Sequence, residues 1–187
     1  MYRYLFPILW LSWATYWLAA SLNAKVTARR ESYGSRLFHI GLLGFAGFLL
    51  WIPNSPIPAL GIRFLPPAAR TFWLGAALTL AGLLFTVWAR VHLGRNWSAT
   101  ITIKQDHTLI TSGPYGLVRY PIYSGLLLAF VGFALARGDW RGIVAVIIAF
   151  GALWRKLRIE ERWLREQFGV AYEEYRSRVA ALIPFLL

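Results

Sequence analysis

The sequence predicts an all-α integral membrane protein with about five transmembrane helices and a C-terminal amphipathic helical tail. Of its 187 residues, 58% are hydrophobic and the mean hydropathy is +0.50, whereas soluble proteins average roughly 45–50% apolar residues. The apolar residues gather in spans near the roughly 20 residues that cross a bilayer, and most of the charge lies between the spans. We expect one domain over residues 1–187, with a three-helix part (1–92) and a second part (93–187).

The N-terminal part contains three apolar spans, at residues 4–24, 37–52 and 71–93. The first follows a weakly basic start and is long for a secretory leader, so we expect it to be retained as a helix. The third is followed by Gly94, a residue type that favours the end of a helix. The proline-rich stretch 53–67 predicts a surface loop between the second and third spans.

Three glycines, Gly41, Gly44 and Gly47, recur at every third position of the second span. They predict a face that another helix could approach closely, because small residues let helix backbones touch in membranes. Glycine is also frequent in membrane helices in general. The sequence therefore leaves both interpretations open.

The second part predicts a helical hairpin followed by the tail. Residues 122–136 and 142–157 are short apolar spans joined by a tight polar turn, an arrangement typical of a hairpin. We expect a cytoplasmic amphipathic tail over residues 159–178, because its apolar residues recur at steps of three and four. Gly169 is positioned to divide this tail into two helices. Before the hairpin, residues 95–104 predict an extended connector that is too short to build a sheet.

The basic residues predict the orientation in the membrane. The net charge is +12, and fifteen of the twenty lysine and arginine residues lie in segments that would share one side of a five-span bundle. Basic residues concentrate on the cytoplasmic side, so the loop before the hairpin and the C-terminus should be cytoplasmic and the N-terminus outside. Because the charge lies at the ends of the spans, we expect membrane lipid rather than nucleic acid as its partner.

The longest run that no apolar period explains lies between the third and fourth spans, at residues 107–125. It contains Gly113, Tyr115, Arg119, Tyr120, Pro121, Tyr123 and Gly125, and the tail adds Glu160-Glu161, Phe168-Gly169, Tyr172, Tyr175 and Ile183-Pro184-Phe185. In this order the pieces resemble the signature of the isoprenylcysteine carboxyl methyltransferase family, which is related to the phospholipid N-methyltransferases. The resemblance covers roughly the C-terminal half. Its one departure is Tyr120, where the family has a histidine.

The resemblance implies a methyltransferase that uses S-adenosyl-L-methionine and methylates, by in-line transfer, a carboxylate like that of a prenylated cysteine or another lipophilic or small acceptor. The implied cofactor-binding residues are His107, Thr108, Leu109, Ile110, Tyr115, Tyr120, Pro121, Ile122, Tyr123 and Glu160. Among them, Glu160 matches the residue that binds the amino group of the cofactor. Lys156, or its neighbour Arg155, matches a contact to the substrate carboxylate. A tyrosine cannot be cationic as a histidine can, so a role that needs an imidazole is not available to Tyr120.

The residues themselves favour Glu160 over Glu161 as the functional carboxylate. Glu160 lies on the apolar stripe of the tail, where a charge needs a partner, whereas Glu161 can pair with Arg165 four residues later. The tyrosines beside Pro121 fit either an aromatic belt at the membrane surface or aromatic faces that attract a sulfonium. Arg119 fits either a topological role or a clamp for a phosphate or carboxylate.

Other chemistries have little support. Cysteine is absent and the three histidines are scattered, so we expect no metal site. The sequence has no nucleotide-binding glycine loop and no evident Ser-His-Asp set, and no covalent or acid–base catalytic residue stands out. Methyl transfer to oxygen, sulfur or nitrogen stays open. The alternatives are a membrane reductase of the sterol-reductase-like fold that uses NADPH, and a non-catalytic membrane scaffold.

Overall fold

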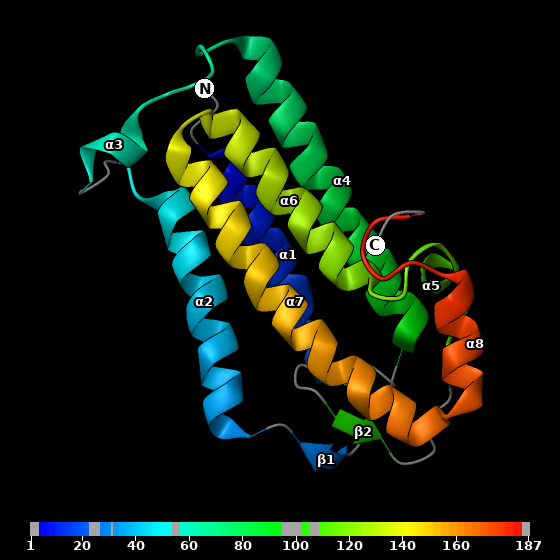
Figure 1. The fold of residues 1–187 in the computed structure, drawn as a ribbon. Coiled ribbons are helices and arrows are strands. Elements are labelled where there is room, and N and C mark those ends of the chain that lie inside the picture. Colours follow the sequence, from blue (N-terminus) through cyan, green and yellow to red (C-terminus); the bar gives the residue numbers. More distant parts are fainter. Residues whose placement is uncertain are drawn as a thin grey trace.

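The structure is a computed structural model, and it describes residues 4–22, 27–30, 32–53, 57–94, 102–104 and 109–184. Its elements, in chain order, are α1 (Leu5–Ser21), β1 (Thr27–Arg30), α2 (Tyr33–Trp51), α3 (Pro58–Gly61), α4 (Ala69–Leu93), β2 (Thr102–Lys104), α5 (Pro114–Leu117), α6 (Pro121–Arg137), α7 (Trp140–Phe168) and α8 (Val170–Arg178). The long helices run side by side, with α6 packed between α4 and α7 and with α2 against α7 (Figure 1). The prediction of a helical bundle is therefore confirmed.

Two helices have the character of membrane spans. Among the described residues, α2 and α4 are long and apolar enough to cross a membrane, and α6 is a shorter apolar helix. The helix boundaries follow the local signals that the sequence contains: α4 ends at Gly94, which takes a φ of 55°, and Pro121 occupies the first turn of α6. The number of five spans stays a prediction.

The expected division between the last apolar span and the tail is wrong. α7 continues through this region as one helix of 29 residues. No glycine or proline interrupts residues 152–168, and most residue types there favour a helix. The helix ends where Gly169 takes a φ of 52°, a conformation that costs glycine little. The predicted break at Gly169 is confirmed.

The expectation that residues 95–104 form only an extended connector is also wrong in part. Thr102–Lys104 forms β2, which pairs antiparallel with β1 and makes a two-stranded ribbon. The partner strand precedes the second span, far away in the chain, so no local pattern could reveal the pairing. This ribbon is a small addition to an otherwise helical fold.

Helices α4 and α6 meet along a seam of glycines. A Cβ atom placed on Gly75 would lie 2.4 Å from the carbonyl oxygen of Gly132, and one on Gly82 would lie 2.4 Å from that of Gly125. On each helix the two glycines are seven residues apart, so they lie on one face of that helix. The backbones of α4 and α6 therefore touch directly. The Thr79 hydroxyl lies in the seam, 2.9 Å from the Gly75 oxygen.

The glycines of the second span have no such role in the described structure. A Cβ atom placed on Gly41, Gly44 or Gly47 would meet no neighbouring atom within 4 Å among the described residues. The structure therefore favours the general frequency of glycine in membrane helices over a close helix contact on this face of α2. The seam on α4 forms because the facing helix also has glycine at the matching heights.

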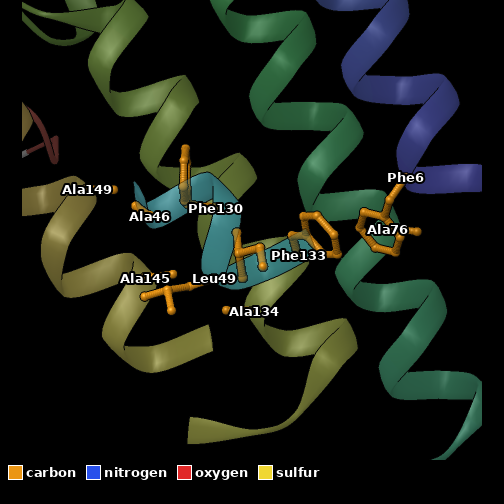
Figure 2. Packing of buried hydrophobic residues seen from close by; sticks show 10 residues of the cluster. Phe6, Ala46, Leu49, Ala76, Phe130, Phe133, Ala134, Ala145 and Ala149 are labelled. Carbon is orange, nitrogen blue, oxygen red and sulfur yellow. The ribbon is translucent and has the colours of Figure 1, made fainter. Parts of the chain in front are cut away.

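Aromatic side chains fill the core between α1, α4 and α6. Phe6 stacks on Phe133 with ring centres 4.3 Å apart and meets Phe72 edge to face at 5.7 Å. Trp10 meets Phe130 edge to face at 5.5 Å. Figure 2 shows that small residues of α7, such as Ala145 and Ala149, face this cluster together with Ala46 and Leu49 of α2. This cluster lies in the half of the bundle away from the signature, and a second buried cluster packs around Tyr120 and Tyr123.

The turn between α6 and α7 is held by a buried carboxylate. Asp139 is 3% exposed and accepts hydrogen bonds from Arg137 at 2.9 Å and Arg141 at 2.7 Å. The same arginines donate to the carbonyl oxygens of Leu50 and Ile52 at the end of α2, at 2.8 and 3.1 Å. These contacts, the Asp139 clasp, satisfy backbone groups that the end of a helix leaves open.

We expect Asp139→Asn to lower the free energy of unfolding by about 1–3 kcal/mol, because the arginines would lose a charged acceptor. Burial opposes the ionised form, yet the hydrogen bonds and charges of Arg137 and Arg141 hold the pKa of Asp139 below its ordinary value. This contribution is therefore complete above the unfolded-state pKa of about 3.9 and is lost as the pH falls through the lower folded-state value. Thermal unfolding in detergent should show a gap between wild type and variant that narrows on acidification. A gap that stays constant would contradict the clasp.

Candidate functional site

The signature residues form two tight turns at one end of the bundle. Gly113 takes a φ of 59° before the single turn of α5, and Tyr120 is the N-cap residue of α6. The chain therefore folds back twice within a few residues. This arrangement buries Tyr115, Tyr120 and Tyr123, each less than a tenth exposed.

The centre of the site joins the signature to α7. The rings of Tyr120 and Tyr123 stack with centres 5.5 Å apart. The Tyr123 hydroxyl donates to Glu160 Oε1 at 2.7 Å, and Lys156 Nζ lies 5.5 Å from the centre of the Tyr123 ring. The structure thus brings Tyr120, Tyr123, Lys156 and Glu160 together, although Tyr123 and Glu160 are far apart in the sequence.

The expected pairing of Glu161 with Arg165 is only a minor contact. Glu161 is 4% exposed, and its closest partner is Arg119, at 2.5 Å. Arg165 lies farther away, at 3.9 Å, on a side chain that is 41% exposed. The structural role predicted for Glu161 is confirmed with a different partner, and Arg119 is occupied by this ion pair rather than presented as an open clamp.

The segment after α8 lies across the signature, as the red C-terminal part of Figure 1 shows beside α5. The backbone N–H groups of Arg119 and Tyr120 donate to the carbonyl oxygens of Ala180 and Ala181 at 2.8 and 3.0 Å. The Arg119 side chain also donates to the Val179 carbonyl. We call Arg119, Glu161 and residues 179–181 the tail latch, because they fix the tail to the signature and to α7.

The tail adds two tyrosines to the site. The Tyr175 hydroxyl donates to the carbonyl oxygen of Tyr115 at 2.6 Å, and the hydroxyls of Tyr172 and Tyr120 lie 3.4 Å apart. Burial raises the pKa of Tyr115, Tyr120, Tyr172 and Tyr175, and for Tyr115 the nearby Glu160 raises the pKa further. All four therefore remain neutral hydrogen-bond donors over the physiological pH range.

The other predicted site residues lie in several different environments. Ile122 packs against the Tyr120–Tyr123 cluster, and Leu109 and Ile110 are half-buried before the first turn. Arg155 points toward α2, where it donates to Ser35 Oγ at 3.0 Å and covers the Phe38 ring at 5.1 Å. Pro121 is buried at the start of α6. His107 and Thr108 lie outside the described residues.

One residue near the signature was not singled out from the sequence. His92, at the end of α4, has Nε2 3.0 Å from Ser112 Oγ, and its ring stacks with Tyr115 at 6.4 Å. A Cβ atom on Gly113 would lie 2.7 Å from the His92 ring, so the glycine is needed for this approach as well as for its positive φ. The signal was a histidine in the last turn of a long apolar span, and such a histidine has many ordinary explanations.

Comparison with known proteins supports the resemblance. Residues 70–171 match the family model described as phospholipid methyltransferase. The chain is 33% identical over 130 residues to a probable protein-S-isoprenylcysteine O-methyltransferase of Oryza sativa subsp. indica, covering 64% of this chain and 66% of the relative. It is 30% identical over 151 residues to the protein-S-isoprenylcysteine O-methyltransferase of Schizosaccharomyces pombe, covering 78% and 62%.

A relative with a different kind of name also matches. The cobalt-zinc-cadmium resistance protein CzcN of Cupriavidus metallidurans is 33% identical over 116 residues, covering 61% of this chain and 52% of that protein. In each of these three alignments the chain spans less than two thirds of the length of its relative.

Proposed function

Because the chain belongs to the phospholipid methyltransferase family, we propose that it is an integral-membrane methyltransferase that takes its methyl group from S-adenosyl-L-methionine. The observation that supports this most is the hydrogen bond of 2.7 Å from Tyr123 to Glu160. It holds a half-buried carboxylate beside two stacked tyrosine rings. An amino acid that carries a sulfonium would meet there the groups that bind its positive charges.

The chemistry of the side chains fits this cofactor. A carboxylate in a partly buried site forms strong charge-assisted hydrogen bonds with an ammonium group, which is the role proposed for Glu160. Aromatic faces attract a cation through their quadrupole, which is the role proposed for Tyr120 and Tyr123. The other residues of the proposed cofactor-binding set are His107, Thr108, Leu109, Ile110, Tyr115, Pro121 and Ile122.

The protein's part in the reaction would be to align two reactants and exclude water. The bound cofactor supplies an electrophilic methyl group, and a carboxylate or thiolate acceptor needs no base to attack it. Alignment of this kind can contribute roughly 7–11 kcal/mol to catalysis. The tail latch would help to keep water out, because it covers the signature with residues 179–181.

We propose a lipophilic carboxylate as the acceptor, in line with the isoprenylcysteine O-methyltransferases that the chain resembles. Lys156 is the residue best suited to bind that carboxylate, because it lies over the Tyr123 ring, whereas Arg155 turns toward α2. Small thiol and amine acceptors would be compared in the same assay. Mass spectrometry of the products would identify the methylated atom.

We further propose five spans, with the signature and the C-terminus in the cytoplasm and the N-terminus outside. The excess of basic residues in the segments around the signature and the tail supports this orientation. The cofactor, which is soluble, would then reach the site from the cytoplasm. A lipophilic acceptor would reach it from the bilayer.

The test is binding of S-adenosylhomocysteine to the detergent-purified protein, measured by calorimetry. We expect the wild type to bind and Glu160→Gln to bind about tenfold more weakly, a loss of about 1.4 kcal/mol. Glu174→Gln is the matched control, because Glu174 is exposed on α8 and the substitution is chemically the same. If the folded wild type bound no S-adenosylhomocysteine, the proposal would be wrong, and a nicotinamide cofactor would be tested next.

A further inference from the structure

The two faces of α7 differ sharply near its middle. Glu160 and Glu161 turn inward, where they meet Tyr123 and Arg119. Arg158 and Arg162 are exposed and four residues apart, so they share the outward face of the helix. Among the described residues, neither arginine forms an ion pair with a carboxylate. The outward face therefore carries two exposed arginines, and the next exposed carboxylate on it, Glu166, lies one turn beyond Arg162.

Nearer its N-terminus α7 exposes apolar side chains, and Ile147 lies on the face of Arg158, about three turns earlier. Ile143, Ile147 and Phe150 are exposed large hydrophobic residues on α7, with 37, 63 and 38% of their surfaces accessible. The change from exposed apolar residues to exposed arginines takes place between Phe150 and Arg155. A helix surface that changes in this way passes from the hydrocarbon of a bilayer into the layer of lipid headgroups.

The exposed residues of α2 change between polar and apolar at the same height along the bundle. Its exposed Leu37, Phe38 and Ile40 follow a polar start. Arg155 bridges the two helices at this height, since its guanidinium lies over the Phe38 ring and donates to Ser35 Oγ. Beyond this bridge, α7 runs away from α2 and toward α8 (Figure 1), so Arg158 and Arg162 are not covered by α2.

We infer that Arg158 and Arg162 form a docking surface for anionic phospholipid headgroups, with the acyl chains lying along the exposed apolar residues that precede them on α7. A guanidinium is suited to this partner, because its planar fork of donors matches the oxygens of a phosphate. Each arginine near an anionic membrane surface contributes about 1 kcal/mol. We call these two residues the arginine face.

The test compares lipid affinity in the full-length protein. Binding of phosphatidylglycerol and of phosphatidylcholine would be measured by native mass spectrometry of detergent-purified wild type and of Arg158→Gln/Arg162→Gln. We expect the wild type to prefer phosphatidylglycerol, and the double variant to lose about fivefold of that preference for each arginine removed. In the wild type, the preference for phosphatidylglycerol should decrease at high salt, because salt screens the attraction.

The control is Arg70→Gln/Arg178→Gln, which removes the same charge from exposed positions on α4 and α8. It should keep the preference of the wild type. Thermal unfolding in detergent verifies that both double variants are folded, and this check does not depend on whether the protein binds a cofactor. An unchanged preference after removal of the arginine face would overturn the inference, as would an equal loss in the control or no preference in the wild type. These outcomes are independent of whether the protein transfers methyl groups.

Discussion

Gly82→Ala should destabilise the protein by more than about 3 kcal/mol, above the usual cost of overpacking a core. The added methyl group would lie 2.4 Å from the carbonyl oxygen of Gly125 and 2.6 Å from the backbone nitrogen of Ala129. Neither atom can rotate away as a side chain could, so α4 and α6 would have to separate. Their separation would also move Tyr123, which lies half a turn before Gly125 on α6. We expect lower unfolding temperatures in detergent and weaker binding of S-adenosylhomocysteine.

Gly44→Ala is the matched control for this substitution. It places the same methyl group on α2, where no described atom lies within 4 Å, and alanine favours a helix over glycine by up to about 1 kcal/mol. This variant should unfold at or slightly above the wild-type temperature. If both variants behaved alike, the seam between α4 and α6 would not be the contact that holds these helices together.

Arg119→Met should cost about 3–5 kcal/mol of unfolding free energy, because it leaves the buried carboxylate of Glu161 without its closest partner. The side chains of Arg119 and Glu161 are only 9 and 6% exposed, so water can replace little of the lost interaction. The substitution also removes the donor to the Val179 carbonyl, which weakens the attachment of the tail to the signature and leaves only the backbone hydrogen bonds to Ala180 and Ala181 in the latch. Both unfolding temperature and S-adenosylhomocysteine binding should fall.

Two further variants distinguish the effect of breaking the tail latch from the effect of simply removing a positive charge. Arg165→Met removes a cation that approaches Glu161 only to 3.9 Å and pairs more closely, at 3.1 Å, with Glu173. Its effect should be below about 1 kcal/mol, because an ion pair between partly exposed side chains contributes little. Adding Glu161→Gln to Arg119→Met should recover part of the stability, since no charge then remains buried. Limited proteolysis of the tail would detect its release directly. A tail that stays protected in Arg119→Met would argue against the latch.

Local signals in the sequence predicted the parts of the fold that depend on single residues. Pro121 begins α6, and Gly94 and Gly169 end α4 and α7 with positive φ angles. Each of these follows from the conformations that proline and glycine can adopt. The apolar stripe also identified Glu160 as a residue of the inward face, and its contact with Tyr123 agrees with that prediction.

The contacts between distant segments could not be predicted in the same way. The partner of Glu161 is Arg119, and the partner of β2 is β1. Both pairs require the chain to return across the bundle, and no local period encodes such a return. The α4–α6 seam likewise depends on glycines that match in height on two helices, whereas the more regular glycines of α2 face no helix in the described part of the chain.

The turn at Asp139 and the contact between Tyr123 and Glu160 lie at opposite ends of the same pair of helices. With a rise of 1.5 Å per residue, the arm from the turn to Tyr123 is about 20 Å long and the arm to Glu160 about 30 Å. Over these lengths, a change of about 2–3° in the angle between α6 and α7 at the turn displaces their far ends by about 1 Å. In enzymes, a displacement of this size can cost about a hundredfold in rate when it misplaces reacting groups. The Asp139 clasp therefore controls how far apart Tyr123 and Glu160 lie, although it is at the opposite end of the two helices.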